Sequence, residues 1–381
     1  MRIAINIRSF TNRGGIGQYA RSLVKNLVML FPNHHFLLFG IRGIDTSSLP
    51  ETKNWQYYPV HGPSNRLMWE RFALTQSVND ENPDIYHNPD YTAPPGIISP
   101  VVVTVHDLSF KYFPDGLSLK AKILYNLTVP RSIERATLAI ADSHFTKSEI
   151  KRAGWKNVND IRVVHLGVDE IFFDAIIDDE IESVLKQYNL QRGYILYLGA
   201  LDKRKNIISI LHAYNQLKNE GVKIPKLVLA GEDIGGGAQL TSEILKLKLG
   251  NDVLRIGFIS HEHIRQIYRG ASMFVFPSHY EGFGLPPLEA MACGVPVITS
   301  DSASLPEVVG DAGFMVPVGH IPPLAEAMRI FITDNTIREE YSLKAKERAK
   351  NFTWQKTAKE TMDAYLEAVN KQKRTVPFPK K

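Results

Sequence analysis

Two kinds of hydrophobic pattern alternate along the chain. Short apolar runs rich in β-branched residues are separated by longer segments whose apolar positions recur at helical spacing, and this alternation is typical of βαβ units that build a parallel sheet. In the first half we expect strands at 2–7, 35–41 and 101–105 and a helix at 15–30. The pattern restarts with a strand-like run at 194–199. The sequence therefore predicts two doubly wound α/β domains, with ligands bound in the cleft between them.

The domain boundaries are placed where this pattern pauses, and a chain of 381 residues suits two domains. We assign the first to 1–180 and the second to 190–352, joined by the acidic stretch 178–193. That stretch would equally suit a surface helix of the first domain. An amphipathic helix at 353–370 follows, and then a basic tail at 371–381 that we expect to be disordered.

Composition limits the class of protein. With 44% apolar and 22% charged residues the chain is that of a folded protein. Its one cysteine, Cys293, excludes an internal disulfide framework, and no Cys/His group has zinc-ligand spacing. No apolar run reaches membrane-spanning length and the first residues look like a strand rather than a signal peptide, so we expect a cytoplasmic protein. The net charge of +5 suits anionic partners without choosing among nucleotides, phospholipids and nucleic acid.

The segment 277–296 has the layout of a loop that binds anions. A strand-like run precedes it, a glycine-containing loop follows, and prolines open a helix that ends at Gly294. Backbone N–H groups of Phe283, Gly284 and Leu285, together with the helix dipole, would face a ligand that carries phosphate or hydroxyl groups.

Two carboxylates flank this turn. Glu281 precedes it, and we place Glu289 in the first helical turn. A carboxylate accepts hydrogen bonds from two vicinal hydroxyls, which suits Glu289 to the edge of a ribose. The structural alternative for Glu289 is a side chain that only complements the helix N-terminus.

A basic loop, 199–206, follows the first strand of the second domain. Gly199 ends that strand, and Arg204 and Lys205 come a few residues later. Preorganised cations there would stabilise the negative charge that develops on a departing diphosphate. The alternative is a solvated basic turn.

The segment 277–296 resembles the E-x7-E signature of retaining glycosyltransferases of family 4, which have the GT-B fold, and the likeness covers nearly the whole chain. The resemblance implies that Glu281 contacts the transferred sugar near its C3 hydroxyl. It further implies that the amides of Phe283 and Gly284 hold sugar hydroxyls and that Glu289 binds the ribose. The first domain would bind the acceptor and the second the nucleotide sugar.

The basic loop matches this family with one departure. Lys205 corresponds to the family lysine, but Ala200 stands where the family usually has an arginine directly after the strand glycine. We expect Arg204 to supply the missing guanidinium, and Gly199 to belong to the donor site.

Two segments of the first half also resemble the family. His106-Asp107, at the end of the strand 101–105, is similar to a His-Asp pair that contacts the donor sugar, so we expect a catalytic contact from His106, with Asp107 only orienting it. The glycine loop before the helix 15–30 lies, in the family, beside the diphosphate and the acceptor, which makes Gly15 and Gly17 binding candidates. Weaker likenesses occur at 84–87, 142–149 and 165–169, and 352–354 resembles the segment that leads the last helix back to the first domain.

The same motifs look like those of bacterial mannosyltransferases that build O-antigen or exopolysaccharide chains. The resemblance implies a retaining hexosyltransferase that uses GDP-mannose and a glycan or lipid-linked glycan acceptor, and no nucleic acid. The sequence has no Asp-x-Asp, the metal-chelating device of the other large glycosyltransferase fold, so we expect neither a metal nor another cofactor. Two mechanisms remain open. In one, the acceptor attacks on the face that the diphosphate leaves; in the other, a carboxylate of the enzyme forms a covalent glycosyl-enzyme.

Other readings of the chain stay open at this point. A nucleotide-sugar epimerase on the same fold would release nucleoside diphosphate without an acceptor, and a non-catalytic sensor would bind the donor without transfer. The segment 119–131 mixes lysines with aliphatic residues. It would suit peripheral contact with the inner face of an anionic membrane, or simply a helix with one core face and one solvated face.

Overall fold

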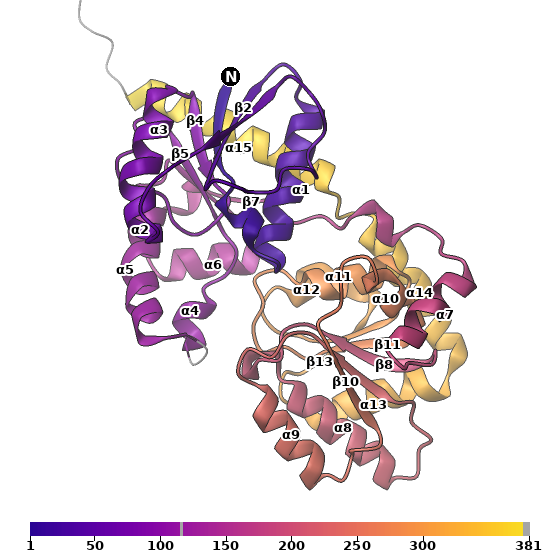
Figure 1. The fold of residues 1–381 in the computed structure, drawn as a ribbon. Coiled ribbons are helices and arrows are strands. Elements are labelled where there is room, and N and C mark those ends of the chain that lie inside the picture. The colour runs from indigo at the N-terminus through magenta and orange to yellow at the C-terminus, as the bar shows by residue number, and fades with distance from the viewer. Residues whose placement is uncertain (115–116, 376–381) are drawn as a thin grey trace, which may run out of the picture. The chain divides into compact units, whose positions relative to one another are not determined.

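The computed structural model describes residues 1–114 and 117–375, which form two compact units (Figure 1). One unit combines residues 1–167 with the C-terminal segment from Thr353, and the other is Val168–Phe352. The chain thus enters the second unit before the predicted boundary at residue 180. The acidic helix α7 (Asp178–Gln187) packs against α10 (Ile264–Gly270). It therefore belongs to the second unit and is neither a linker nor a helix of the first domain.

The first unit is built on seven parallel strands in the order β3-β2-β1-β4-β5-β6-β7. Its central strands are almost entirely buried because helices cover both faces of a doubly wound sheet, and Asn6, His87, Asn88 and Thr104 are buried polar residues among the apolar ones. The strands are β1 (Arg2–Asn6), β2 (His35–Gly40), β3 (Trp55–Pro59), β4 (Ile85–Asn88), β5 (Val101–Val105), β6 (Leu138–Ala141) and β7 (Ile161–Val163).

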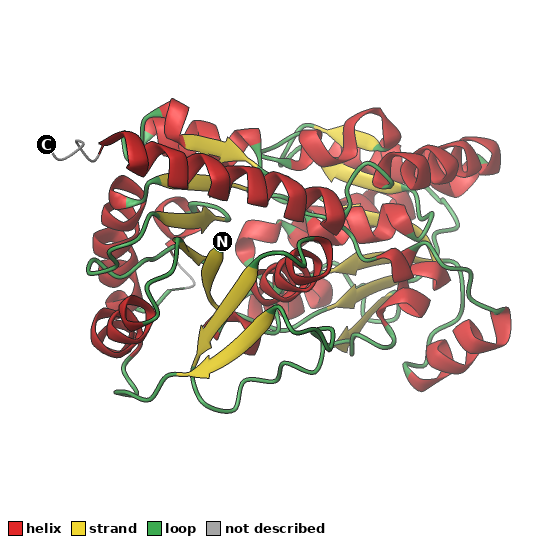
Figure 2. Ribbon diagram, turned by 90° about the horizontal axis from the view of Figure 1, so that it is seen from above, coloured by secondary structure: helices red, strands yellow, loops and turns green. Residues whose placement is uncertain are grey.

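Helices flank this sheet (Figure 2), and the long α1 buries one apolar face, which includes Tyr19, Leu23 and Leu27. The helical segments are the 3-10 helix η1 (Arg8–Thr11), α1 (Gly15–Leu30), α2 (Arg66–Met68), the π-helix η2 (Trp69–Leu74), α3 (Thr75–Asp80), α4 (Ser109–Tyr112), α5 (Leu119–Arg135), α6 (His144–Arg152), the 3-10 helix η4 (Val158–Asp160) and α15 (Trp354–Thr375).

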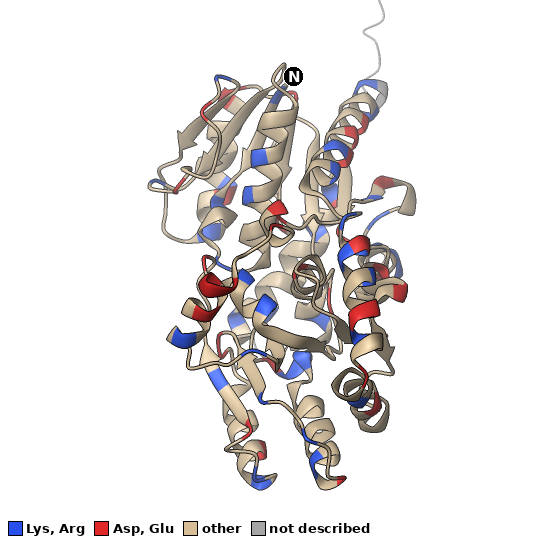
Figure 3. Ribbon diagram, turned by 90° about the vertical axis from the view of Figure 1, so that its right-hand side faces the viewer, with Lys and Arg blue, Asp and Glu red and all other residues tan. Residues whose placement is uncertain are grey.

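The last helix returns to the first unit, as predicted: α15 packs against α1. The predicted start of a disordered tail at 371 is wrong, because α15 continues to Thr375. Lys371 is held there by Asp160 and Glu367, at 2.6 and 2.9 Å. The helix α15 carries side chains of both charges and can therefore form such ion pairs (Figure 3, the helix that leads into the grey trace). Residues 376–381 lie outside the described part of the chain.

The second unit has six parallel strands in the order β10-β9-β8-β11-β12-β13. They are β8 (Tyr194–Leu198), β9 (Leu227–Ala230), β10 (Val253–Gly257), β11 (Ala271–Phe276), β12 (Val297–Ser300) and β13 (Phe314–Val316). Besides α7 and α10, the helices are α8 (Ile207–Asn219), α9 (Gly237–Lys246), α11 (Leu285–Ala292), α12 (Leu305–Val309), α13 (Ile321–Thr333) and α14 (Asn335–Ala349).

The predicted fold class, two doubly wound α/β domains, is confirmed. In each sheet the strand order reverses once, between β1 and β4 in the first unit and between β8 and β11 in the second. Loops on the two sides of such a reversal diverge at the carboxyl ends of the strands and leave room for a ligand. Over the residues described, none of the helices combines the length and the apolar character needed to cross a bilayer.

Candidate active site

The basic and acidic loops of the second unit meet at its strand-order reversal. The basic loop follows β8 and the acidic loop follows β11, the neighbouring strand. Asn206 has left-handed backbone geometry, with φ of 54°, a conformation that asparagine adopts more readily than most residues. Its side-chain amide donates to the Pro277 carbonyl at 3.1 Å. The two loops are thereby fixed against each other.

A buried ion pair links the two loops. The Lys205 ammonium lies 2.6 Å from Glu281 Oε1, and each side chain is only 10% exposed. Ser278 donates its hydroxyl to the same carboxylate oxygen. Burial alone would raise the pKa of Glu281, but Lys205 and Arg204 outweigh it and lower this pKa. Glu281 is therefore ionised at neutral pH.

Arg204 lies beside this pair. Its guanidinium donates to the Tyr280 carbonyl at 2.6 Å and approaches Glu281 Oε2 at 3.4 Å. Two cations thus converge on one buried carboxylate. Arg204 Nε also lies 3.8 Å from Asp202 Oδ2, so two cations and two carboxylates meet at this edge of the sheet.

The acidic loop leads into the N-terminus of α11 at the same edge of the sheet. Gly284 caps α11 with φ of 117°, a conformation that strongly favours glycine. Phe283 and Leu285, on either side of it, are buried. Ser304 holds the loop, because its hydroxyl lies within hydrogen-bond distance of the carbonyl oxygens of both Glu281 and Phe283, at 2.9 and 2.8 Å. The first N–H groups of α11 have no partner within the helix, as at any helix N-terminus.

Glu289 lies in the second turn of α11, which begins at Leu285, and not in the first turn as expected. It does not complement the helix N-terminus, because no acidic residue occurs in the first turn. Its buried carboxylate accepts a hydrogen bond of 3.0 Å from the Tyr268 hydroxyl, which orients it.

A cavity of about 210 Å³ adjoins the basic loop. The beginning of α8 and the beginning of α9 form its walls, and Asp202, Asn206 and His279 contribute polar groups. Burial lowers the pKa of His279, which favours the neutral imidazole. Open space thus borders the basic loop next to α8 and α9.

His106, the candidate of the first unit, lies directly after β5 and has both ring nitrogens engaged. Nδ1 is 2.7 Å from Asp142 Oδ2, and Nε2 is 3.3 Å from the Pro89 carbonyl oxygen. The expectation that Asp107 orients this ring is wrong. Asp107 Oδ1 instead accepts hydrogen bonds from the Tyr91 hydroxyl and from the backbone and hydroxyl of Ser109.

Comparison with known proteins identifies the family. The model of "Glycosyltransferase Family 4" matches residues 13–171, and that of "Glycosyl transferases group 1" matches residues 179–351. The chain is 31% identical over 367 residues to the O-antigen chain mannosyltransferase B of Escherichia coli, covering 92% of this chain and 95% of that one. The chain belongs to glycosyltransferase family 4. The predicted family and the predicted enzyme class, a glycosyltransferase, are therefore confirmed.

A further relative and a solved structure of the same fold are informative. One is the N-acetylgalactosamine-N,N'-diacetylbacillosaminyl-diphospho-undecaprenol 4-alpha-N-acetylgalactosaminyltransferase of Campylobacter jejuni, 32% identical over 201 residues, or 52% of this chain and 53% of that one. The other, a solved structure, is sucrose-phosphate synthase from Thermosynechococcus elongatus, with a TM-score of 0.77 and 20% identity over 97% of this chain and 100% of that one. The structural likeness supports the fold of the glycosyltransferase.

The ion pair of His106 gives the glycosyltransferase a predicted pH dependence. Burial alone would lower the pKa of His106, but Asp142 outweighs it and raises the pKa from 6.5 to about 9. Because His106 binds its proton more tightly in the folded state, the pair stabilises the fold fully below pH 6.5. This contribution is lost as the pH rises through 9. We expect the free energy of unfolding to fall by about 3 kcal/mol between those limits. An Asp142→Asn variant should lack most of this fall in urea titrations, and an identical pH profile in the variant would contradict the assignment.

The structure gives a packing role to Gly17 and places Gly199 against Gly231, whereas Gly15 is exposed. A Cβ at Gly17 would lie 1.8 Å from the Asn12 carbonyl oxygen, so only glycine fits against that loop. Gly15 is the exposed first residue of α1. Gly199 lies against Gly231, where a Cβ would meet the Gly199 oxygen at 1.9 Å. Contacts of these glycines with a ligand remain predictions.

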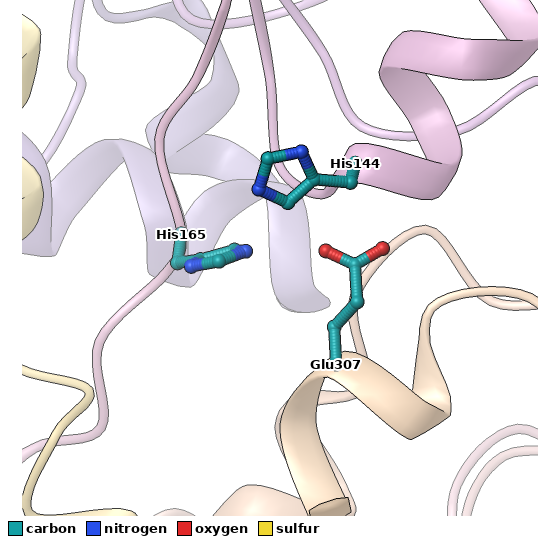
Figure 4. A group of neighbouring side chains, drawn as sticks. All are labelled: His144, His165 and Glu307. Atoms are coloured by element: carbon teal, nitrogen blue, oxygen red, sulfur yellow. The ribbon is translucent and has the colours of Figure 1, made fainter.

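Two of the weaker family-like stretches, 142–149 and 165–169, meet through their histidines. His144 begins α6 and His165 follows β7, and their rings meet edge to face with centroids 5.8 Å apart (Figure 4). The Thr357 hydroxyl of α15 donates to the His165 carbonyl at 2.8 Å. This part of the enzyme therefore holds α15 in place.

Sequence reasoning missed the residues that support the predicted ones. Asp142, Ser304 and Tyr268 hold His106, the acidic loop and Glu289, but each is distant in sequence from the group it holds. Only Asp142 could have been suspected from the sequence, because it directly follows a strand, β6, as His106 directly follows β5. These two strands are neighbours in the sheet.

Proposed function

We propose that this glycosyltransferase transfers a mannosyl group from GDP-mannose to a growing, lipid-linked O-antigen chain, with retention of anomeric configuration. The name of the Escherichia coli relative, an O-antigen chain mannosyltransferase, supports the sugar and the product. The name of the Campylobacter relative includes a diphospho-undecaprenol, which supports a lipid-linked acceptor.

The observation that carries the proposal is the arrangement of Arg204 and Lys205 around Glu281. An arriving diphosphate would compete with the carboxylate for these two cations. Glu281 would then have an oxygen available to accept a hydrogen bond from a sugar hydroxyl. When the sugar–phosphate bond breaks, the negative charge that develops on the leaving oxygen would meet cations that are already in position.

The remaining steps use the amides of the acidic loop and the acceptor hydroxyl. The amides of Phe283 and Gly284 would hold hydroxyls of the transferred mannose, and Glu289 would bind the ribose. A hydroxyl of the donor sugar would bind His106 Nε2 in place of the Pro89 carbonyl, which lies 3.3 Å from this nitrogen. We propose attack from the face that the diphosphate leaves, without a divalent metal, because the sequence lacks the Asp-x-Asp that chelates one in the other fold.

Transfer assays test this proposal directly. The purified enzyme would be incubated with GDP-mannose, UDP-glucose or UDP-N-acetylglucosamine and a mannose-terminated diphospholipid acceptor, with and without EDTA. We expect a mannosyl product from GDP-mannose alone, an α linkage by NMR, and unchanged rates in EDTA. A β linkage or transfer from a UDP-sugar alone would overturn the assignment, and acceptor-independent conversion of the donor would favour an epimerase.

The face of α4 and α5 supports peripheral contact with an anionic membrane. Leu119, Ile123 and Leu127, one helical turn apart on α5, are 73%, 54% and 49% exposed. Tyr112 of α4, which packs against α5, is also exposed. The sequence 111–133 contains four basic residues and one acidic residue, Asp115, which lies outside the described part of the chain. Exposed aliphatic side chains among basic ones suit the interface of an anionic bilayer.

Liposome flotation checks this membrane contact. We expect the wild-type enzyme to float with vesicles that contain phosphatidylglycerol, and the triple variant Leu119→Ser, Ile123→Ser and Leu127→Ser to remain unbound. The double variant Leu245→Ser and Leu343→Ser is a matched control, because these leucines are 70% and 73% exposed in the second unit. Equal flotation of all three proteins, or none with anionic vesicles, would rule this surface out.

A further inference from the structure

Charged side chains gather at the strand-order reversal of the first unit. Arg8 lies two residues after the end of β1, and Asp90 lies two residues after the end of β4, the adjacent strand. The loops that carry them diverge at the position where ligands of doubly wound sheets bind. This is the same position, in the other sheet, as that of Lys205 and Glu281 in the second unit.

Arg66 connects the two carboxylates of this cluster. Its Nε donates to Glu70 Oε1 and its Nη2 to Asp90 Oδ2, both at 2.7 Å. The Glu70 side chain is 5% exposed, that of Asp90 13% and that of Arg66 36%. Glu70 is therefore a supporting group, because it also accepts a hydrogen bond from the Thr92 hydroxyl at 3.2 Å. Arg66 and Asp90 are the accessible members.

Arg8 also belongs to this cluster, and the N–H groups of its guanidinium are available to a ligand. Its guanidinium carbon lies 5.3 Å from the centroid of the Trp69 ring, whose indole N–H is fixed by the Val60 carbonyl at 3.1 Å. Among the residues that the structure describes, none accepts a hydrogen bond from this guanidinium. Burial lowers the pKa of Arg8, and the charge of Arg66 lowers it further. The Arg8 guanidinium is thus partly buried, and the Trp69 ring positions its N–H donors.

The backbone under the cluster is also unusual. Trp69 and Glu70 begin the π-helix η2. Such helices are rare and are found frequently at functional sites, because the extra residue in the turn re-aims side chains. Here the wide turn lets Trp69 reach Arg8 while Glu70 reaches Arg66.

The balance of charge indicates what the cluster would bind. Arg8 and Arg66 carry two positive charges, and Glu70 and Asp90 carry two negative charges. An anionic group would meet no net attraction, but a neutral polyol would find carboxylate acceptors and guanidinium donors a few ångströms apart. Terminal sugars of a glycan present such alternating hydroxyls.

We propose that Arg8, Arg66 and Asp90 bind the uncharged terminal hexose of the acceptor glycan, with Glu70 and Trp69 as positioning residues. This inference rests on the proposed function, since it names the acceptor-binding side chains of the same reaction. The partly buried guanidinium of Arg8 donates to hydroxyls of that sugar, and Asp90 accepts from a hydroxyl.

Steady-state kinetics of Arg8→Gln and Asp90→Asn test the proposal, with a synthetic neutral mannoside as acceptor. We expect each variant to raise the KM for the mannoside about ten- to hundredfold, as for a lost hydrogen bond to a charged group, and to change the KM for GDP-mannose less than about twofold. Arg2→Gln is the matched control, because Arg2 begins the same strand at its opposite end and pairs with the exposed Glu81.

Saturation-transfer NMR with the same mannoside gives a readout that does not depend on catalysis. We expect saturation transfer from the wild-type enzyme and from Arg2→Gln, and its loss in Arg8→Gln. Unchanged KM values and unchanged NMR binding in both variants would overturn the inference. If the wild-type enzyme binds the mannoside but transfers nothing to it, the proposed function fails while the binding site stands. Stronger binding of a mannoside phosphate would overturn the choice of a neutral sugar.

Discussion

Replacing Lys205 by methionine should lower kcat by about 10²–10³-fold, the loss measured when one preorganised charge-stabilising group is removed from an active site. The side chain of methionine fills a similar volume, but it carries no charge toward a departing diphosphate. The rate of mannosyl transfer at saturating donor and acceptor measures this effect. Lys218→Met is the matched control, because Lys218 belongs to an exposed ion pair with Asp252 in the same unit.

Leaving-group dependence separates a catalytic role of Lys205 from a structural one. If Lys205 stabilises charge on the leaving oxygen, a donor with a more acidic leaving group needs less help. The loss of kcat in Lys205→Met, relative to the wild type, should therefore be smaller when an activated nitrophenyl mannoside replaces GDP-mannose. A folded variant whose kcat stays within about threefold of the wild type, or whose deficit is the same for both donors, would contradict the role.

Glu281→Gln should destabilise the fold by about 3–5 kcal/mol, because Lys205 would remain buried without its counter-ion. The double variant Lys205→Met with Glu281→Gln should regain most of this loss, since removing both members of a buried pair is often close to neutral. Urea titrations of the two single variants and the double variant give the coupling energy. Loss in the double variant equal to the sum of the single losses would show that the two side chains do not interact.

The pH dependence of the Glu281→Gln effect has a definite sign. The pKa of Glu281 is lowered from 4.5 in the fold, so its ion pair contributes fully above 4.5 and loses this contribution as the pH falls through the lowered value. The difference in unfolding free energy between wild type and variant should therefore be constant near neutral pH and decrease in acid. A difference that persists unchanged into strong acid would assign the stabilisation to another group.

Local sequence determined most of the elements of this glycosyltransferase. The helix expected at 15–30 is α1 with the same bounds, and the strand expected at 101–105 is β5. The acidic loop could also be located, because Gly284 must take a positive φ and prolines must open α11, and both requirements are local. Periodicity and turn chemistry act over a few residues, so they are readable before the fold is known.

Only the tertiary structure decided which side chains meet. Asp142, and not the adjacent Asp107, pairs with His106, because parallel pairing of β5 and β6 brings the ends of these strands together. The cluster of Arg8, Arg66 and Asp90 likewise depends on β1 and β4 being neighbours in the sheet. Side chains distant in sequence come together through strand order and register, which no local pattern encodes. The sequence by itself therefore determined the elements and the motifs, and the folding of the two sheets determined the partners of each charged group.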